Sequence, residues 1–250
     1  MDLKPFINWI IHSLALFAAP GDEIVASHPP FTSMNTHSIE PYQGNPRLGF
    51  IYQYLCSQLF SQSDNFELLA EEIQIQQDNK TVGAIDFIVK NSHAEIEHWE
   101  VAIKFYLLHG DRWYGPNAKD RLDKKLSHML NHQLTMSSHP CFIAQYPQWR
   151  NIKHKLLIQG RLYINPFLQQ QIPTDCAGYP LNPSQINGYW CYQSQFHQIK
   201  QPLYILDKQK WAVGEAIHHK PYTGQSERFV HCQAENGDFW FVVPDGWPNE

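Results

Sequence analysis

The order of the predicted elements from residue 46 onward indicates an α+β protein with a central mixed sheet. A helix-like segment comes first, three strand-like segments separated by short turns follow, and a second helix-like segment leads into another strand. This αβββαβ order predicts an antiparallel meander covered by helices, an α/β sandwich. The composition agrees, because 43% hydrophobic and 17% charged residues in a chain of 250 are typical of a globular protein with a full core.

The N-terminal run 6–19 predicts a buried helix. It holds Asn8 and His12 and is too short and too polar to span a membrane, so no membrane association is expected. Export through a leader peptide is the alternative. Residues 21–45 are rich in Pro, Ser, His and Asn, which predicts a surface connection with at most a short helix near Ile24.

The core begins with a predicted helix at residues 46–60. Its apolar positions follow helical spacing, and Pro46 suits a helix start. Residues 66–77 then predict a strand, since apolar and polar residues alternate in their second half. Turn residues Asp78 and Asn79 lead to the next strand, residues 82–90, in a hairpin.

The third strand, residues 95–108, has two different faces because side chains alternate along a strand. One face is apolar, and it comprises Trp99, Val101, Ile103 and Phe105. The other face comprises His98, Glu100, Ala102 and Lys104. On the preceding strand, Asp86 stands between Ile85 and Phe87.

A carboxylate at such a position costs several kcal/mol if it is buried without a partner. One interpretation is a structural ion pair of Asp86 or Glu100 with Lys104. The other is a site for a divalent cation, formed by the two carboxylates with the lysine beside them. The residue types leave both interpretations open.

The next predicted helix covers residues 117–134, with Asn117 as its N-cap. One face is an apolar stripe, and Gln133 lies beside it. Another face carries basic or potentially basic groups at helical spacing, and these are Arg121, Lys125, His128 and His132. This face is either an ordinary solvated surface or a strip that contacts phosphates.

Short apolar runs at 140–144 and 155–164 predict further strands. From residue 166 the chain is rich in Pro and Gln, and short strands are expected near 203–206, 228–233 and 238–243. The predicted organisation is therefore an N-terminal helix and connection (1–45), a core (46–165) and a β-rich C-terminal portion packed on it (166–250). The adjacent pair His218 and His219 is a weak candidate metal site, because neighbouring residues on a strand point apart.

Charge and cysteine usage limit the function classes. The net charge of −5 argues against a protein that coats nucleic acid, so any such contact must be local. The five cysteines are scattered and contain no Cys-x-x-Cys, which excludes a zinc ribbon and favours a reducing cytoplasm. The common phosphate-loop, dinucleotide, serine-hydrolase and zinc-protease motifs are absent from the sequence.

An acidic residue on the second strand, followed by an acidic residue and a lysine on the third, resembles the core of the PD-(D/E)XK (restriction endonuclease-like) superfamily. Particular strings also resemble a bacterial domain-of-unknown-function family, number eighteen fifty-three, placed in that superfamily. The strings are residues 46–49, 82–87, 98–106, 115–123, 132–134, 188–190 and 243–248. The resemblance covers roughly residues 25–248, and the block from Gly83 to Leu134 is the most specific part.

The resemblance implies a metal-dependent hydrolase, a nuclease acting on DNA or RNA. Asp86 and Glu100 would hold Mg²⁺ or Mn²⁺, and Lys104 would stabilise the charge on the phosphate. The accessory contacts would come from Gln53, His98, Arg121, Lys125 and Gln133. Protein partners are not specified by the sequence.

Two positions depart from the superfamily pattern. The second acidic residue should stand two positions before Lys104, where Ala102 is found, and Glu100 lies roughly 6–7 Å further back at about 3.3 Å per residue. The helix before the meander carries Gln53 where an acidic residue is expected, and an amide is a poor ligand for a hard cation. These departures favour the alternative function, a catalytically degenerate module that binds nucleic acid or protein.

Overall fold

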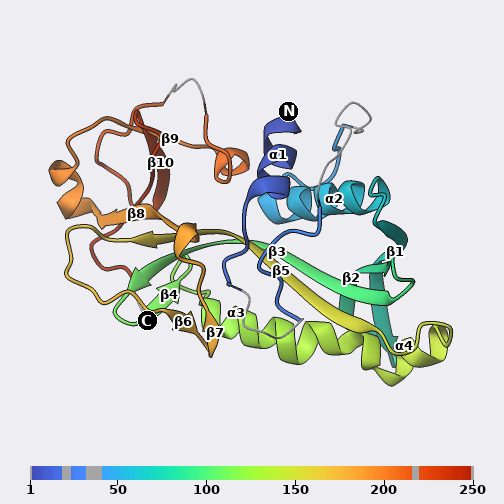
Figure 1. Ribbon diagram of the computed structural model, residues 1–250. Helices are drawn as coiled ribbons and strands as arrows, with labels where there is room; N and C mark the ends of the chain where they lie inside the picture. Colours follow the sequence, from blue (N-terminus) through green and yellow to red (C-terminus); the bar gives the residue numbers. More distant parts are fainter. Residues whose placement is uncertain (1, 19–23, 32–40, 216–219, 249–250) are drawn as a thin grey trace. The chain divides into compact units, whose positions relative to one another are not determined.

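The computed structural model describes residues 2–18, 24–31, 41–215 and 220–248. Within these residues the chain forms four α-helices and a mixed sheet of nine strands, which confirms the predicted α+β class (Figure 1). The fold divides into two compact units. The first unit combines residues 1–103 with 126–159, and the second combines 104–125 with 160–250.

The sheet of the first unit contains the predicted meander. Its strands are β1 (Phe66–Gln77), β2 (Lys80–Asn91), β3 (Ile96–His109) and β5 (Lys153–Ile164), paired in that order. β3 and β5 contribute residues to both units. Asp78 and Asn79 have φ of 51° and 59°, the left-handed values that a two-residue hairpin turn requires. The predicted strands at 66–77, 82–90 and 95–108 are thus confirmed.

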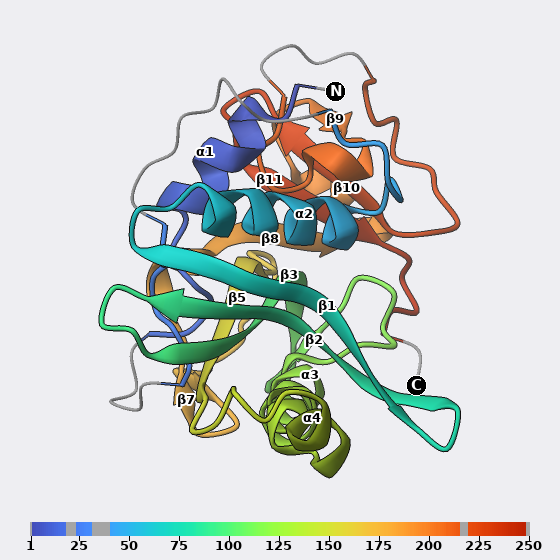
Figure 2. The same cartoon turned by 90° about the vertical axis from the view of Figure 1, so that its right-hand side faces the viewer.

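Helices cover both faces of this sheet (Figure 2). On one face lies α2 (Leu48–Ser61), whose Phe60 ring is 5.3 Å from the ring of Phe87 and 5.8 Å from that of Trp99. On the other face lies the helical segment that ends in α4 (Pro140–Gln145). Its residues Met136 and Phe142 form a buried cluster with Ile88 of β2. The predicted helix at 46–60 is confirmed, with its start at Leu48.

Two predictions for the segment after the meander were wrong. The helix begins at α3 (Leu122–His128) and not at Asn117, because residues 115–120 form a loop in which Ala118 has a φ of 61° and Asn117 Oδ1 accepts a hydrogen bond from Lys119 N. The run at 140–144 is the helix α4 and not a strand. Pro140 suits the first turn of a helix, and His139 Nδ1 accepts a hydrogen bond from Cys141 N at 3.3 Å.

The N-terminal prediction was partly wrong. α1 spans Lys4–His12 and does not continue toward Ala19. Instead, Ala15 forms an antiparallel bridge with Gln159, and Leu16 N donates to Ile158 O at 2.8 Å, so the chain leaves the helix to pair with β5. Near Ile24, where at most a short helix was expected, the described residues 24–31 form none, and Val25 makes a parallel bridge with Leu156.

The second unit is built mainly of strands. It contains β4 (Arg112–Tyr114), β8 (Ile186–Tyr192), β9 (Leu203–Ile205), β10 (Val230–Ala234), β11 (Phe239–Val243) and the small hairpin of β6 (Asp175–Cys176) and β7 (Tyr179–Pro180). From the end of β5 the order is β5-β8-β11-β10-β9. The three short strands predicted in this region are confirmed, and His218 and His219 lie outside the described residues. Of the helices that the structure describes, none combines the length and hydropathy needed to cross a membrane.

Candidate functional site

Asp86 and Glu100 meet where the paired register of β2 and β3 ends. That register runs from Lys90 opposite Ile96 to Phe87 opposite Trp99. Just past it, Asp86 Oδ2 accepts a hydrogen bond from the Val101 backbone N at 3.0 Å, and Glu100 Oε1 accepts one from the Asp86 backbone N at 3.2 Å. Each carboxylate therefore takes the place of a ladder hydrogen bond and holds the neighbouring strand.

The Glu100 side chain is fully buried, with 0% exposure. Besides the Asp86 N–H, His98 Nε2 lies 2.8 Å from Oε1, and Gln133 Nε2 donates to Oε2 at 2.7 Å. Three N–H groups facing one carboxylate explain how a charge is tolerated at a buried position. Gln133 closes the π-helix Met129–Gln133, a local widening of the helix that is often found at functional sites.

Asp86 is half-buried, and α2 supplies its second partner. Gln53 Nε2, from the inner side of α2, donates to Asp86 Oδ1 at 3.3 Å. The two Asp86 oxygens are thus held from different elements, one by the β3 backbone and one by the helix. The neutral amide of Gln53 orients the Asp86 carboxylate without cancelling its charge.

His98 connects Glu100 to two residues that the sequence analysis did not identify. Its Nδ1 lies 3.0 Å from Ser137 Oγ, which in turn lies 3.0 Å from His154 Nε2. Burial lowers the pKa of His98 to about 4, while the charge of Asp86 opposes this shift, so the imidazole is neutral at pH 7. No pattern in the sequence could have marked Ser137 or His154, because the contacts link residues far apart in the chain.

The three basic residues predicted for the site belong to the second unit. There, Lys104 Nζ forms an ion pair of 2.9 Å with Asp120 Oδ2, an acidic partner that the sequence analysis missed. Arg121 pairs with Asp123, whose hydrogen bond raises the pKa of the guanidinium. Lys125 is half-buried on α3. The structure therefore brings five predicted residues together in the first unit, namely Gln53, Asp86, His98, Glu100 and Gln133. The roles of Lys104, Arg121 and Lys125 stay predictions.

Comparison with known families gives one result. A family model described as a domain of unknown function, DUF1853, matches residues 27–236. The chain belongs to the DUF1853 family. This confirms the family resemblance, whereas no finding supports membership of the PD-(D/E)XK superfamily, which stays a prediction. No curated protein and no solved structure matched the chain.

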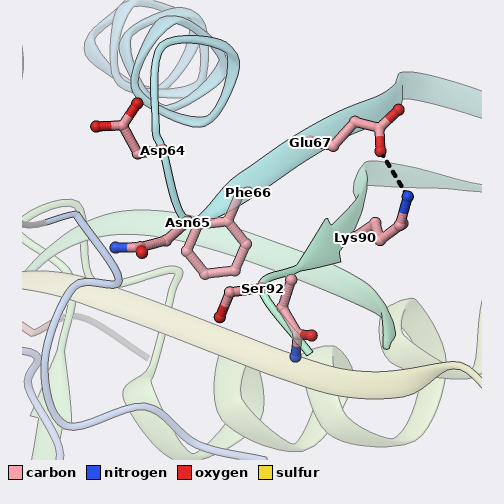
Figure 3. A pocket seen from close by; sticks show the side chains of 7 residues that line it. Asp64, Asn65, Phe66, Glu67, Lys90 and Ser92 are labelled. Carbon is pink, nitrogen blue, oxygen red and sulfur yellow. Dashed lines mark hydrogen bonds and ion pairs between the residues drawn. The ribbon is translucent and has the colours of Figure 1, made fainter. Parts of the chain in front are cut away.

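The DUF1853 chain also has surface hollows that contain none of the predicted site residues. One, of about 180 Å³, is lined by the loop before β1 and the turn after β2, with Asn65, Phe66 and Ser92 around it (Figure 3). At its rim Lys90 Nζ forms an ion pair of 2.9 Å with Glu67 Oε2. A hollow of about 200 Å³ in the second unit is lined by Asp111, Trp113, Asp123 and Cys176, among others.

The donor set at the candidate site fits a hard divalent cation. Among the described residues of this DUF1853 protein, no group of three or more His, Cys, Asp or Glu side chains is placed to hold a metal ion. Mg²⁺, however, is usually held by only one or two protein carboxylates, and it keeps several waters or binds substrate phosphates. Asp86 and Glu100 supply two such carboxylates from adjacent strands. Oxygen donors of this kind suit Mg²⁺ or Mn²⁺ better than a soft metal, and a bound Mg²⁺ or Mn²⁺ stays a prediction.

Proposed function

We propose that this DUF1853 protein is a divalent-metal-dependent phosphodiesterase that acts on nucleic acid. The observation that carries the proposal is a pair of hydrogen bonds between β2 and β3: Glu100 Oε1 accepts from the Asp86 backbone N, and Asp86 Oδ2 accepts from the Val101 backbone N. They place two carboxylates on adjacent strands at the point where the paired register of these strands ends. Mg²⁺ or Mn²⁺ bound there would polarise a phosphate and lower the pKa of a water molecule.

The remaining residues of the site orient the two carboxylates by hydrogen bonds. Gln53 donates to Asp86, while Gln133 and neutral His98 donate to Glu100. None of these three donors carries a positive charge at pH 7, so the two negative charges remain available to attract a cation. The carboxylates are oriented before the metal arrives, which reduces the ordering cost of binding.

A second candidate function is a binding module without catalysis. It is favoured by the complete burial of the Glu100 side chain, whose oxygens already accept hydrogen bonds from three N–H groups. It is also favoured by Ala102, since this position would carry an acidic ligand in a nuclease of the resembled type. In this alternative the network stabilises the fold, and nucleic acid or a protein binds elsewhere.

A metal titration separates the two candidates. Binding of Mg²⁺ and Mn²⁺ would be measured by calorimetry on the wild type, on Asp86→Asn and on Asp64→Asn, an exposed control with the same change of charge. The same proteins, with Lys104→Gln added, would be tested for cleavage of single- and double-stranded DNA and RNA. The hydrolase requires metal binding and cleavage that Asp86→Asn abolishes and Asp64→Asn preserves. Metal binding without cleavage favours the binding module, and no binding at millimolar metal rules out the metal site.

A further inference from the structure

We propose that Ser137 and His154 are positioning residues for the candidate metal site. They act through His98, which they hold in the one orientation and tautomer that donates a hydrogen bond to Glu100. The inference rests on the proposed function, because it concerns the affinity of the Glu100 carboxylate for the metal. It deepens that function by extending the site to two residues that do not touch the metal or the substrate.

The contacts form one continuous chain across three elements. From β3, His98 Nε2 lies 2.8 Å from Glu100 Oε1 and Nδ1 lies 3.0 Å from the Ser137 hydroxyl, which belongs to the 3₁₀-helix Leu134–Ser138. The same hydroxyl lies 3.0 Å from His154 Nε2 on β5. All of these residues belong to the first unit.

The chemistry of the groups determines which atom donates and which accepts in each of these hydrogen bonds. An ionised carboxylate only accepts hydrogen bonds, so His98 Nε2 carries the proton and donates it to Glu100. With its one ring proton on Nε2, His98 presents an unprotonated Nδ1 to the Ser137 hydroxyl, 3.0 Å away, and accepts from it. The backbone of Leu134 also hydrogen-bonds the ring and favours a proton on it, so the Ser137 hydroxyl is the group that selects this tautomer. That hydroxyl is 3.4 Å from its other acceptor, Leu134 O, and only 3.0 Å from Nδ1. With its proton directed at His98, Ser137 Oγ accepts the N–H of His154.

Burial makes this orientation important. The His98 side chain is fully buried and Ser137 is 6% exposed, so water cannot replace a lost donor at Nδ1. Without that donor, the other tautomer of His98 would turn a lone pair toward the Glu100 carboxylate. The ring of His154 meets the ring of His98 edge-on at 5.8 Å and limits its rotation. Ser137 and His154 thus fix the orientation of His98, and His98 in turn fixes the carboxylate of Glu100, the candidate metal ligand.

Outer residues of this kind usually change metal affinity by about 10–100-fold when they are replaced. The test measures Mn²⁺ affinity by calorimetry for Ser137→Ala and His154→Phe. Two control variants accompany them. His154→Gln retains an amide N–H that can donate to Ser137, and Ser57→Ala removes another hydroxyl from a side chain that is also 6% exposed. Urea unfolding confirms that each variant is folded, and Ser137→Cys, whose thiol is only a weak hydrogen-bond donor, replaces Ser137→Ala if that variant does not fold.

The second readout does not depend on metal. The ¹⁵N chemical shifts of the histidine rings report which nitrogen carries the proton, and the His98 signals are assigned by their loss in His98→Gln. The wild type is expected to show the Nε2–H tautomer alone, and Ser137→Ala a mixture of tautomers. In the metal titration, Ser137→Ala and His154→Phe are expected to bind Mn²⁺ about tenfold more weakly, as is usual for such outer residues. His154→Gln and Ser57→Ala are expected to match the wild type.

The two readouts distinguish failure of the inference from failure of the proposed function. Wild-type affinity in Ser137→Ala and His154→Phe overturns the positioning role while leaving the metal site intact. If the wild type does not bind Mn²⁺, the proposed function fails. The tautomer of His98 then shows whether Ser137 still orients this histidine. An unchanged tautomer in Ser137→Ala then overturns the orienting role of Ser137 as well.

Discussion

Replacement of Glu100 tests the central feature of the structure, a fully buried carboxylate that accepts three N–H groups. The donors are His98 Nε2 at 2.8 Å, Gln133 Nε2 at 2.7 Å and the Asp86 backbone N at 3.2 Å. Two substitutions affect these donors differently. Glu100→Ala removes both acceptor oxygens, while Glu100→Gln keeps the shape and one oxygen.

The structure predicts different costs for the two variants. In Glu100→Ala the buried His98 N–H loses its acceptor, at about 1–3 kcal/mol, and the other two donors lose somewhat less because their residues are half-buried. Relief of the buried charge offsets part of this sum, which leaves about 3 kcal/mol. In Glu100→Gln the amide oxygen can replace Oε1 with its two donors, and the Gln133 amide can rotate to accept from the new NH₂. The cost is then about 1 kcal/mol.

Urea unfolding of the wild type and both variants measures this difference directly. Glu67→Ala is the control, since Glu67 forms an exposed ion pair with Lys90, and such pairs contribute at most about 1 kcal/mol. Glu100→Ala is expected to be less stable than Glu100→Gln by about 2 kcal/mol, the difference between the two costs above. Equal stability of the two variants, or a more stable Glu100→Ala, would refute the hydrogen-bonded carboxylate described above.

Three further predictions concern the rest of the fold. Gly160→Ala is expected to destabilise the protein by about 3 kcal/mol or more in urea unfolding. The reason is that the φ of Gly160 is 149° and an added Cβ would lie 1.7 Å from the backbone O of Lys104. An unfolding midpoint equal to that of the wild type would contradict this close approach. Gly83→Ala is the contrasting case, with a smaller expected cost of about 1–2 kcal/mol, since the atoms nearest its Cβ would all belong to the side chain of Met136, which can change its rotamer. A cost equal to that of Gly160→Ala would show that the buried Met136 side chain cannot move. Burial lowers the pKa of His231 well below 6.5, so the unfolded chain binds this proton first and stability falls as the pH drops below 6.5, by up to about 1.4 kcal/mol per pH unit. Unfolding curves at pH 7 and pH 5 should therefore differ less in His231→Gln than in the wild type, and an equal difference would argue against a neutral buried His231.

The central strands could be predicted from the sequence because their environment is periodic. Successive side chains of a strand point to opposite faces of the sheet, so a strand with two unlike faces shows an alternating sequence, and β1, β2 and β3 were found at the predicted positions. The same argument separated the apolar face of β3, with Trp99, from the face that carries His98 and Glu100. α2 was also recognised from spacing, while the inward position of Gln53 was expected from the superfamily resemblance.

Short and irregular segments could not be predicted in the same way. Residues 140–144 are too few to show a period, and only Pro140 and the contact of His139 Nδ1 with Cys141 N mark the helix α4. The loop before α3 depends on the left-handed conformation of Ala118, which residue preferences do not suggest. The division into two units, in which β3 and β5 each contribute residues to both, is a property of packing and not of composition.

The sequence by itself therefore predicted the α+β class and the DUF1853 family, which are both confirmed, and it singled out Asp86 and Glu100 as candidate site residues. These predictions were possible because alternation on a strand and short motifs depend on residues that are close together in the chain. The tertiary structure alone decided how that pair is held. The hydrogen bonds that link His98 to Ser137 and His154 join residues 39 and 17 positions apart, and no local pattern records them. Hydrogen bonds between side chains depend on where three packed elements place their atoms to within a few tenths of an ångström, and only the folded chain fixes those positions.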